Sequence, residues 1–184
     1  MVYVFLADGF ELVEAMTPVD IMRRAGIEVT TVSLNKTTSV LSSQNVVVEA
    51  DTTTKALAPE KLLETLEAVV LPGGMPGAQN LNDDDTVSAF IAAATLLNKH
   101  IAAICAAPFI LGVRGLLEGK NAVCYPGFED KLYGAKIVTD KKVVVDGKII
   151  TAKAMGVSHE FGLAIVRELK SWSEAERVRD SIFF

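Results

Sequence analysis

Cysteine and histidine are scarce in this chain of 184 residues, which has two of each. Two cysteines do not provide the disulfide framework that stabilises small secreted domains. The two histidines and two cysteines also show no clustered spacing, which argues against a zinc site. We therefore expect no bound metal and no structural disulfide, so a functional cysteine here would act through its own thiol.

The chain also lacks an excess of positive charge and any long apolar run. Its formal net charge is −5, which gives no broad attraction to nucleic acid or to an anionic membrane. The apolar runs are much shorter than a membrane span. Met1 leads directly into the strand-like segment Val2–Leu6, without the pattern of a secretory signal. These features favour a cytoplasmic protein with no nucleic-acid or membrane partner.

What is present is the pattern of one globular α/β domain over residues 1–184, with 50% hydrophobic and 22% charged residues. Strand-like and helix-like segments alternate, which predicts a mostly parallel sheet covered on both faces. The expected strands are Val2–Leu6, Ile27–Leu34, Val46–Val48, Ala68–Leu71, Ile101–Ile104 and a hairpin of Lys142–Val145 and Lys148–Thr151 around Asp146-Gly147. The expected helices are Glu11–Ala25 ended by Gly26, Leu57–Thr65, Asp83–Asn98, Val157–Leu169 and a short helix opened by Ser173 with Glu176.

Cys105 stands in the most informative segment, HIAAICAAPFILG (His100 to Gly112). A strand precedes it, and Ala106 onward has the pattern of a helix with Pro108 in its first turn. Cys105 therefore falls on a strand-to-helix turn, like the nucleophile elbow of hydrolases, where we expect a positive φ. Helix N–H groups at such a turn favour a thiolate. The alternative is a buried cysteine that acts as a small apolar residue.

Ligands of open α/β sheets bind at the carboxyl ends of the strands. Three segments are expected to meet there: Asp8–Glu14, Pro72–Ala78 and Cys105-Ala106. In LPGGMPG (Leu71 to Gly77), two adjacent glycines allow positive φ and close backbone approach, and their N–H groups could bind an oxyanion beside that of Ala106. The alternative is an ordinary glycine-rich turn.

Glu11 and Glu14 open the first expected helix. A carboxylate facing Cys105 would raise the pKa of both groups, unless the carboxyl keeps its proton and hydrogen-bonds to the sulfur. The spacing does not choose between the two glutamates. The plainer interpretation is that both are solvated carboxylates that favour the helix N-terminus.

The remaining candidates have plainer interpretations. Cys124, in AVCYPG, fits the end of a strand better than a second nucleophile. His100 precedes the strand of Cys105, so it should lie at the opposite end of that strand. His159 opens a core helix and is the one histidine expected near a cleft, so we keep it as an accessory candidate.

Four segments together resemble the ThiJ/PfpI superfamily, and in particular the branch of the Parkinson-disease protein DJ-1 and its bacterial relatives. They follow one another in order over nearly the whole chain, and PGGxxGAQNL and AAICAAP are specific in combination. The segments are ADGFELVEAMTPVDIMRRAGIEVT (Ala7 to Thr30), VVLPGGMPGAQNL (Val69 to Leu81), IAAICAAPFIL (Ile101 to Leu111) and HEFGLAIVREL (His159 to Leu169).

The resemblance implies a flavodoxin-like three-layer sandwich, as in class I glutamine amidotransferases, and a homodimer that needs no cofactor. It implies Cys105 as nucleophile, Glu14 as the buried acid paired with it, and the N–H groups of Gly74 and Ala106 as oxyanion donors. Members of the family have been linked to glyoxalase or deglycase activity on methylglyoxal adducts and to chaperone and oxidative-stress roles. Another branch has been linked to peptidase activity.

Tyr125 departs from the family pattern. Many members carry a histidine directly before a proline that follows the nucleophile, whereas here Tyr125 precedes Pro126. A tyrosine, with a pKa of ~10, cannot replace an imidazole base near neutral pH. The Cys–His dyad of a peptidase or amidase is therefore missing from its usual place, and we rank that activity last. Tyr125 is kept only as an accessory candidate.

Two hypotheses rank ahead of a peptidase. The first is a cofactor-free glyoxalase or deglycase that acts on methylglyoxal, as a small aldehyde, or on its glycated adducts. The second is a redox sensor or chaperone in which Cys105 is oxidised and Glu14 hydrogen-bonds to the oxidised sulfur. Both use the same two residues, so the sequence does not separate them.

Overall fold

The computed structural model describes residues 1–57 and 65–184. In these ranges the central sheet is built from β1 (Val2–Leu6), β2 (Val29–Ser33), β5 (Thr52–Thr53), β6 (Ala68–Leu71), β7 (His100–Ile104), β10 (Val143–Asp146) and β11 (Ile149–Ala152). The seven strands follow the order β10-β11-β7-β6-β1-β2-β5. Every neighbouring pair is parallel except β10 and β11, which form an antiparallel hairpin.

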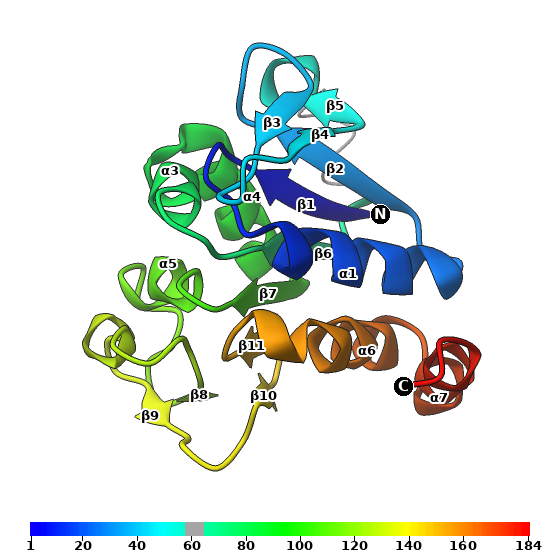
Figure 1. Ribbon diagram of the computed structural model, residues 1–184. Helices are drawn as coiled ribbons and strands as arrows, with labels where there is room; N and C mark the ends of the chain where they lie inside the picture. The colour runs from blue at the N-terminus through cyan, green and yellow to red at the C-terminus, as the bar shows by residue number, and fades with distance from the viewer. Residues whose placement is uncertain (58–64) are drawn as a thin grey trace.

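Helices cover both faces of this sheet (Figure 1). One face carries α1 (Leu12–Arg24) and α6 (Ser158–Leu169), and α7 (Trp172–Ser181) packs against α6. The other face carries α3 (Gly77–Asp83), α4 (Asp85–Leu96) and α5 (Pro108–Gly112). The protein is therefore a three-layer α/β sandwich, as the resemblance implied.

Alternating side chains of β1 divide the core into two halves. Val2, Val4 and Leu6 join the cluster under α1 and α6, whereas Tyr3 and Phe5 join the cluster under α4. All five are buried, because parallel strands in the middle of a sheet have no solvent-facing side. This is why the strand appears in the sequence as a continuous apolar run.

The two helices α1 and α6 cross closely at Gly162. A Cβ at this position would lie 3.0 Å from Ile21 Cδ1 and 3.1 Å from Pro18 Cα. A larger side chain would push α6 away from α1. The absence of a side chain at Gly162 therefore lets α6 pack closely on the middle of α1, the helix that carries Glu14.

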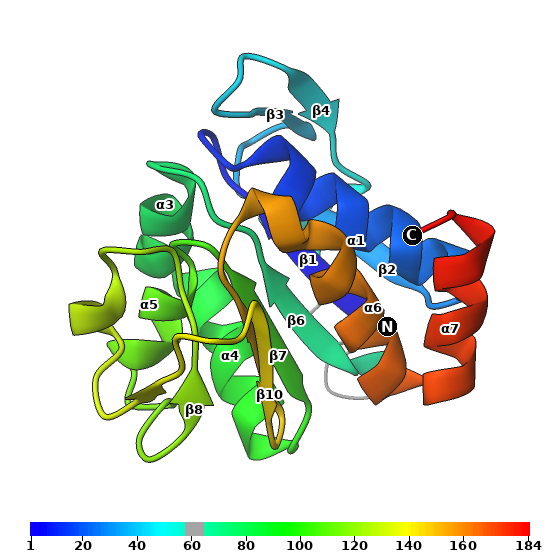
Figure 2. The ribbon, with the colours of Figure 1, turned by 60° about the horizontal axis from the view of Figure 1, so that its bottom comes forward.

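Most of the strand and helix predictions are confirmed to within two residues, including the hairpin around Asp146-Gly147. The strand predicted at Val46–Val48 is real but lies outside the central sheet. It forms a separate hairpin of β3 (Ser39–Leu41) and β4 (Val47–Glu49), which stands apart from the sandwich in Figure 2. Another small pair, β8 (Asn121–Ala122) with β9 (Lys136–Ile137), follows α5.

Three helix predictions need comment. The last helix begins earlier than predicted, because the Oγ of Ser171 rather than that of Ser173 accepts the capping hydrogen bond, from the N–H of Glu174 at 3.1 Å. The helix after Cys105 begins at Pro108 rather than at Ala106. The helix predicted over Leu57–Thr65 falls almost wholly on residues 58–64, outside the described residues.

Within the described ranges, no helix is both long enough and apolar enough to cross a bilayer.

Candidate functional site

The order of the strands brings the three predicted segments together. Because β7, β6 and β1 are parallel neighbours, their carboxyl ends lie at the same edge of the sheet. The turn after β6 touches the segment after β1: a Cβ on Gly74 would lie 2.4 Å from the N atom of Glu11. The same turn touches the segment after β7, since a Cβ on Gly73 would lie 2.6 Å from Cys105 Cβ. Both glycines are thus required by close approach.

Cys105 has the unfavourable backbone conformation that the elbow predicts, with a φ of 64°. Such a conformation costs about 1–3 kcal/mol in a residue other than glycine and persists only where neighbours hold it. Here its N–H donates to the carbonyl of Ala152 at 2.9 Å, and its carbonyl accepts from the N–H of Tyr125 at 2.8 Å. The elbow is therefore fixed from both sides by the ends of neighbouring segments.

Glu14, rather than Glu11, is the carboxyl that faces the sulfur. It is only 1% exposed, and its Oε2 accepts a hydrogen bond from the Gly73 N–H at 3.0 Å. Glu11 instead caps α1 by accepting from the Val13 N–H, and its other oxygen accepts from Ser43 Oγ at 3.2 Å. The two glutamates therefore have separate tasks, although they are less than one helical turn apart.

Both members of the buried Cys105–Glu14 pair have raised pKa values. Burial raises the pKa of Glu14 to about 7, partly offset by hydrogen bonding with the Cys105 thiol and the Gly73 N–H. Burial and, after it, the charge of Glu14 raise the pKa of Cys105 to about 12. Two coupled groups titrate as a pair, so the thiol and the carboxyl together keep one proton over the range between these values.

Two backbone N–H groups oppose the rise in the pKa of Cys105. The N–H groups of Gly74 and Ala106 stabilise the thiolate and lower the pKa of Cys105. The sequence predicts that such donors favour a thiolate, and they do act in that direction, but burial and Glu14 outweigh them. The helix that follows is also short, with five residues starting at Pro108. The negative charge can reside on sulfur when the shared proton resides on Glu14, as the sequence argument required.

The other candidates lie outside this cluster. His159, the accessory candidate, does not approach the cluster. Its ring stacks on Phe184, with 5.1 Å between ring centroids, and it lines a separate hollow with residues of α1 and α7. His100 begins β7, at the end opposite to Cys105. Tyr125 contributes its backbone N–H, while its side chain is half exposed. Cys124 is buried, and burial raises its pKa to about 11.

No group of three or more potential metal ligands occurs in the part of the chain that the structure describes. The site is therefore a cysteine and a proton-holding carboxyl, with two backbone donors. Sequence reasoning missed the supporting contacts from Ala152 and the Tyr125 backbone, because they come from segments far from Cys105 in the chain.

Fold and site together define a flavodoxin-like α/β protein with a cysteine on a nucleophile elbow. The family model described as the DJ-1/PfpI family matches residues 1–168. Protein dj-1beta of Drosophila melanogaster is 36% identical over 176 residues, which cover 95% of this chain and 92% of the relative. The Parkinson disease protein 7 homolog of Danio rerio is 36% identical over 178 residues, covering 96% and 93%.

Solved structures agree with this match. Toxoplasma gondii DJ-1, described as oxidized, has a TM-score of 0.89 and 32% identity, covering 100% of this chain and 97% of that chain. A cysteine-to-alanine mutant of a DJ-1 superfamily protein from Salmonella typhimurium has a TM-score of 0.89 and 33% identity, with the same coverage. The chain belongs to the DJ-1/PfpI family.

The first prediction concerns the two thiols. We expect limiting iodoacetamide to modify Cys105 before Cys124, because the Cys105 thiol is partly exposed to the reagent whereas that of Cys124 is buried. Peptide mapping after brief labelling measures the two sites separately. Faster labelling of Cys124 would show that the elbow does not control thiol reactivity here.

The second prediction concerns stability and pH. Because the pKa of Glu14 rises from 4.5 to about 7 on folding, the folded protein binds this proton more tightly than the unfolded chain. The resulting stabilisation is complete below pH 4.5 and is lost as the pH rises through 7, a change of about 3 kcal/mol. The measurement is the free energy of urea unfolding at a series of pH values from below 4.5 to above 7, for the wild type and for Glu14→Gln. Only the wild type should lose stability as the pH rises through 7. If the unfolding free energies of the two proteins change with pH in the same way, the raised pKa of Glu14 is contradicted.

Proposed function

We propose that this protein is a cofactor-free, cysteine-dependent glyoxalase or deglycase-like stress protein that acts on methylglyoxal or its adducts. The observation that carries the proposal is the Cys105–Glu14 pair, which holds a proton beside a nucleophilic sulfur and two backbone donors. A nucleophilic thiol, a proton carrier and oxyanion donors together can add a thiol to an aldehyde and then move a proton between two carbons.

In the proposed reaction, the thiolate of Cys105 adds to the aldehyde carbon of methylglyoxal, and the N–H groups of Gly74 and Ala106 bind the resulting alkoxide. Glu14, which holds the proton taken from the thiol, first gives it to this alkoxide and, now a carboxylate, removes the proton from the same carbon. It returns a proton to the neighbouring carbonyl carbon, while the hydroxyl proton passes to the ketone oxygen. The product is a lactoyl thioester of Cys105. Water hydrolyses the thioester, which releases lactate and regenerates the thiol.

The electron balance explains why no cofactor is invoked. The aldehyde carbon is oxidised to the level of a carboxylic acid, while the adjacent ketone is reduced to an alcohol within the same molecule. Methylglyoxal and water thus give lactate without an external oxidant or reductant. The protein has only to supply the nucleophile, the proton carrier and the oxyanion donors.

The test is lactate formation from methylglyoxal, measured with the wild type and with Cys105→Ser. Release of lactate that depends on Cys105 supports an enzyme. Absence of lactate with the wild-type protein would remove this proposal. A glycated peptide as substrate extends the same assay to deglycase activity.

A redox sensor or chaperone is the second candidate, because the same donors can bind the oxygens of an oxidised sulfur. Toxoplasma gondii DJ-1, whose structure is described as oxidized, is a related protein. Intact mass after mild peroxide treatment would reveal addition of two oxygen atoms, the mark of a sulfinate, and Cys105→Ser should prevent it. A cysteine peptidase stays last, because Tyr125 is no imidazole base.

We also propose that the protein acts in the reducing cytoplasm as a homodimer. Val46 and Val47 are exposed on the β3–β4 hairpin, at 44% and 60%. Apolar side chains gathered on a protruding hairpin are typical of a surface that a partner covers. Light scattering during size-exclusion chromatography measures the mass of the particle, and a monomer would contradict the dimer.

A further inference from the structure

A cavity of about 460 Å³ lies at the end of the sheet opposite to Cys105. It opens where β7 and β11 begin. Three lysines line it, and its floor is apolar. The lysines are Lys99, Lys120 and Lys148, the apolar residues are Ile101, Leu116 and Ile149, and Thr95, Asn98 and Gly147 complete the lining.

The fold itself brings the three lysines together. The parallel register of β7 and β11 pairs Ile101 with Ile149, which sets Lys148 beside His100. Lys99 precedes His100, so the two lysines lie one residue apart in register, at the same end of neighbouring strands. Lys120 arrives from the segment before β8, and its Nζ lies 3.6 Å from the position of a Cβ on Gly147. Burial is the main cause that lowers the pKa of the adjacent His100; the charges of Lys148 and Lys99 lower it too, and that of Glu168 raises it.

The charge in this cavity is poorly compensated. Among the described residues no carboxylate lines it, and the one ion pair that its lysines form joins Lys120 to Asp146 at 3.9 Å. A chain with a net charge of −5 thus concentrates three cations around one hollow. Like charges held together in this way repel one another, and a bound anion would relieve the repulsion.

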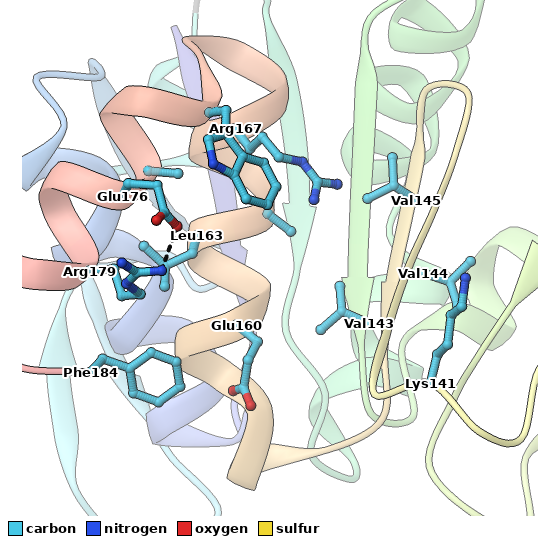
Figure 3. A pocket seen from close by; sticks show the side chains of 13 residues that line it. Lys141, Val143, Val144, Val145, Glu160, Leu163, Arg167, Glu176, Arg179 and Phe184 are labelled. Atoms are coloured by element: carbon cyan, nitrogen blue, oxygen red, sulfur yellow. Dashed lines mark hydrogen bonds and ion pairs between the residues drawn. The ribbon is translucent and has the colours of Figure 1, made fainter.

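A second hollow provides a contrast. It measures about 490 Å³ and lies between β10, α6 and α7 (Figure 3). Its lining includes carboxylates, and its arginines are already paired: Arg179 with Glu176 at 2.6 Å, and Arg167 with Glu168 at 3.0 Å. The arginines of that hollow are therefore already compensated, whereas Lys99 and Lys148 form no ion pair with the described residues.

We propose that the lysine-lined cavity binds a small molecule with two or three linked phosphate groups on an apolar or aromatic body. Lysine ammonium groups bind phosphates as point charges, and three of them match an oligophosphate in charge. The organic part would rest mainly on Leu116, which is partly exposed, whereas Ile101 and Ile149 behind it are buried. The volume is within the range of small-molecule sites.

The test is calorimetric titration at low salt, with inorganic triphosphate and ATP as the probes. Both should bind saturably, and ATP should bind about tenfold more tightly because its base covers the apolar floor. Each of Lys99→Glu, Lys120→Glu and Lys148→Glu should weaken binding about tenfold, and added salt should weaken it in the wild type. Lys141→Glu is the matched control, since it makes the same charge change in the hollow of Figure 3.

Two results would overturn the proposal: no saturable binding of either probe, or equal weakening by Lys141→Glu, which would indicate attraction by overall charge. Equal affinity for triphosphate and ATP would overturn the placement of an organic part on the apolar floor. The neutral variant Lys148→Gln guards against misfolding, because it should weaken binding less than Lys148→Glu while both retain the wild-type melting temperature.

Discussion

Replacing Cys105 with serine should reduce lactate formation from methylglyoxal by about a thousandfold or more. Serine keeps the shape of the side chain, but its hydroxyl is a much weaker nucleophile than a thiolate and has no imidazole base beside it. Neither histidine lies at the site: His100 is at the far end of β7 and His159 stacks on Phe184. Loss of a nucleophile in such a unit typically removes most of the catalysis. Lactate is measured over time at equal protein concentration.

Cys124→Ser is the matched control for this result. It makes the same atomic change at a buried thiol that lies outside the Cys105–Glu14 cluster, so lactate formation should stay close to that of the wild type. Wild-type activity in Cys105→Ser would show that the reaction does not proceed through this sulfur. Equal losses in the two variants would indicate damage to the fold, which thermal unfolding of both proteins would reveal.

The parts of the fold that follow local rules could be predicted from the sequence. The continuous apolar run of β1, the Asp146-Gly147 turn and the Gly26 stop each depend on a few adjacent residues. The β4 strand could be recognised but not placed, because its partner β3 is set by tertiary packing. The sequence does not predict α3, because this helix has only seven residues and begins at a glycine of the glycine-rich turn.

The site shows the same division between local and distant information. The positive φ of Cys105 follows from the strand-to-helix turn, and the structure confirms it. The raised pKa of Cys105 does not follow from the turn, because its main cause is burial under segments that the local sequence does not identify. The orientation of His159 likewise depends on Phe184, which packs on it from the end of the chain.

Glu14→Gln should separate the reactivity of the thiol from turnover. Glutamine keeps an amide donor near the sulfur but carries no transferable proton, so lactate formation should fall by about 10²–10⁴-fold, the usual contribution of a general acid or base. Burial is the main cause of the raised pKa of Cys105, and the charge of Glu14 is the next. The variant removes the second cause, so the pKa of Cys105 should fall and iodoacetamide should label Cys105 faster than in the wild type.

These opposite changes are what identify Glu14 as the proton carrier. A variant with a distorted site would lose turnover without faster iodoacetamide labelling of Cys105. Loss of the proton carrier alone leaves a more reactive sulfur that cannot complete the reaction. Glu11→Gln is the matched control, because Glu11 caps α1 and contacts Ser43 rather than the sulfur, so its turnover should change only a few-fold. Full turnover in Glu14→Gln would contradict the assignment, and so would a larger loss in Glu11→Gln than in Glu14→Gln.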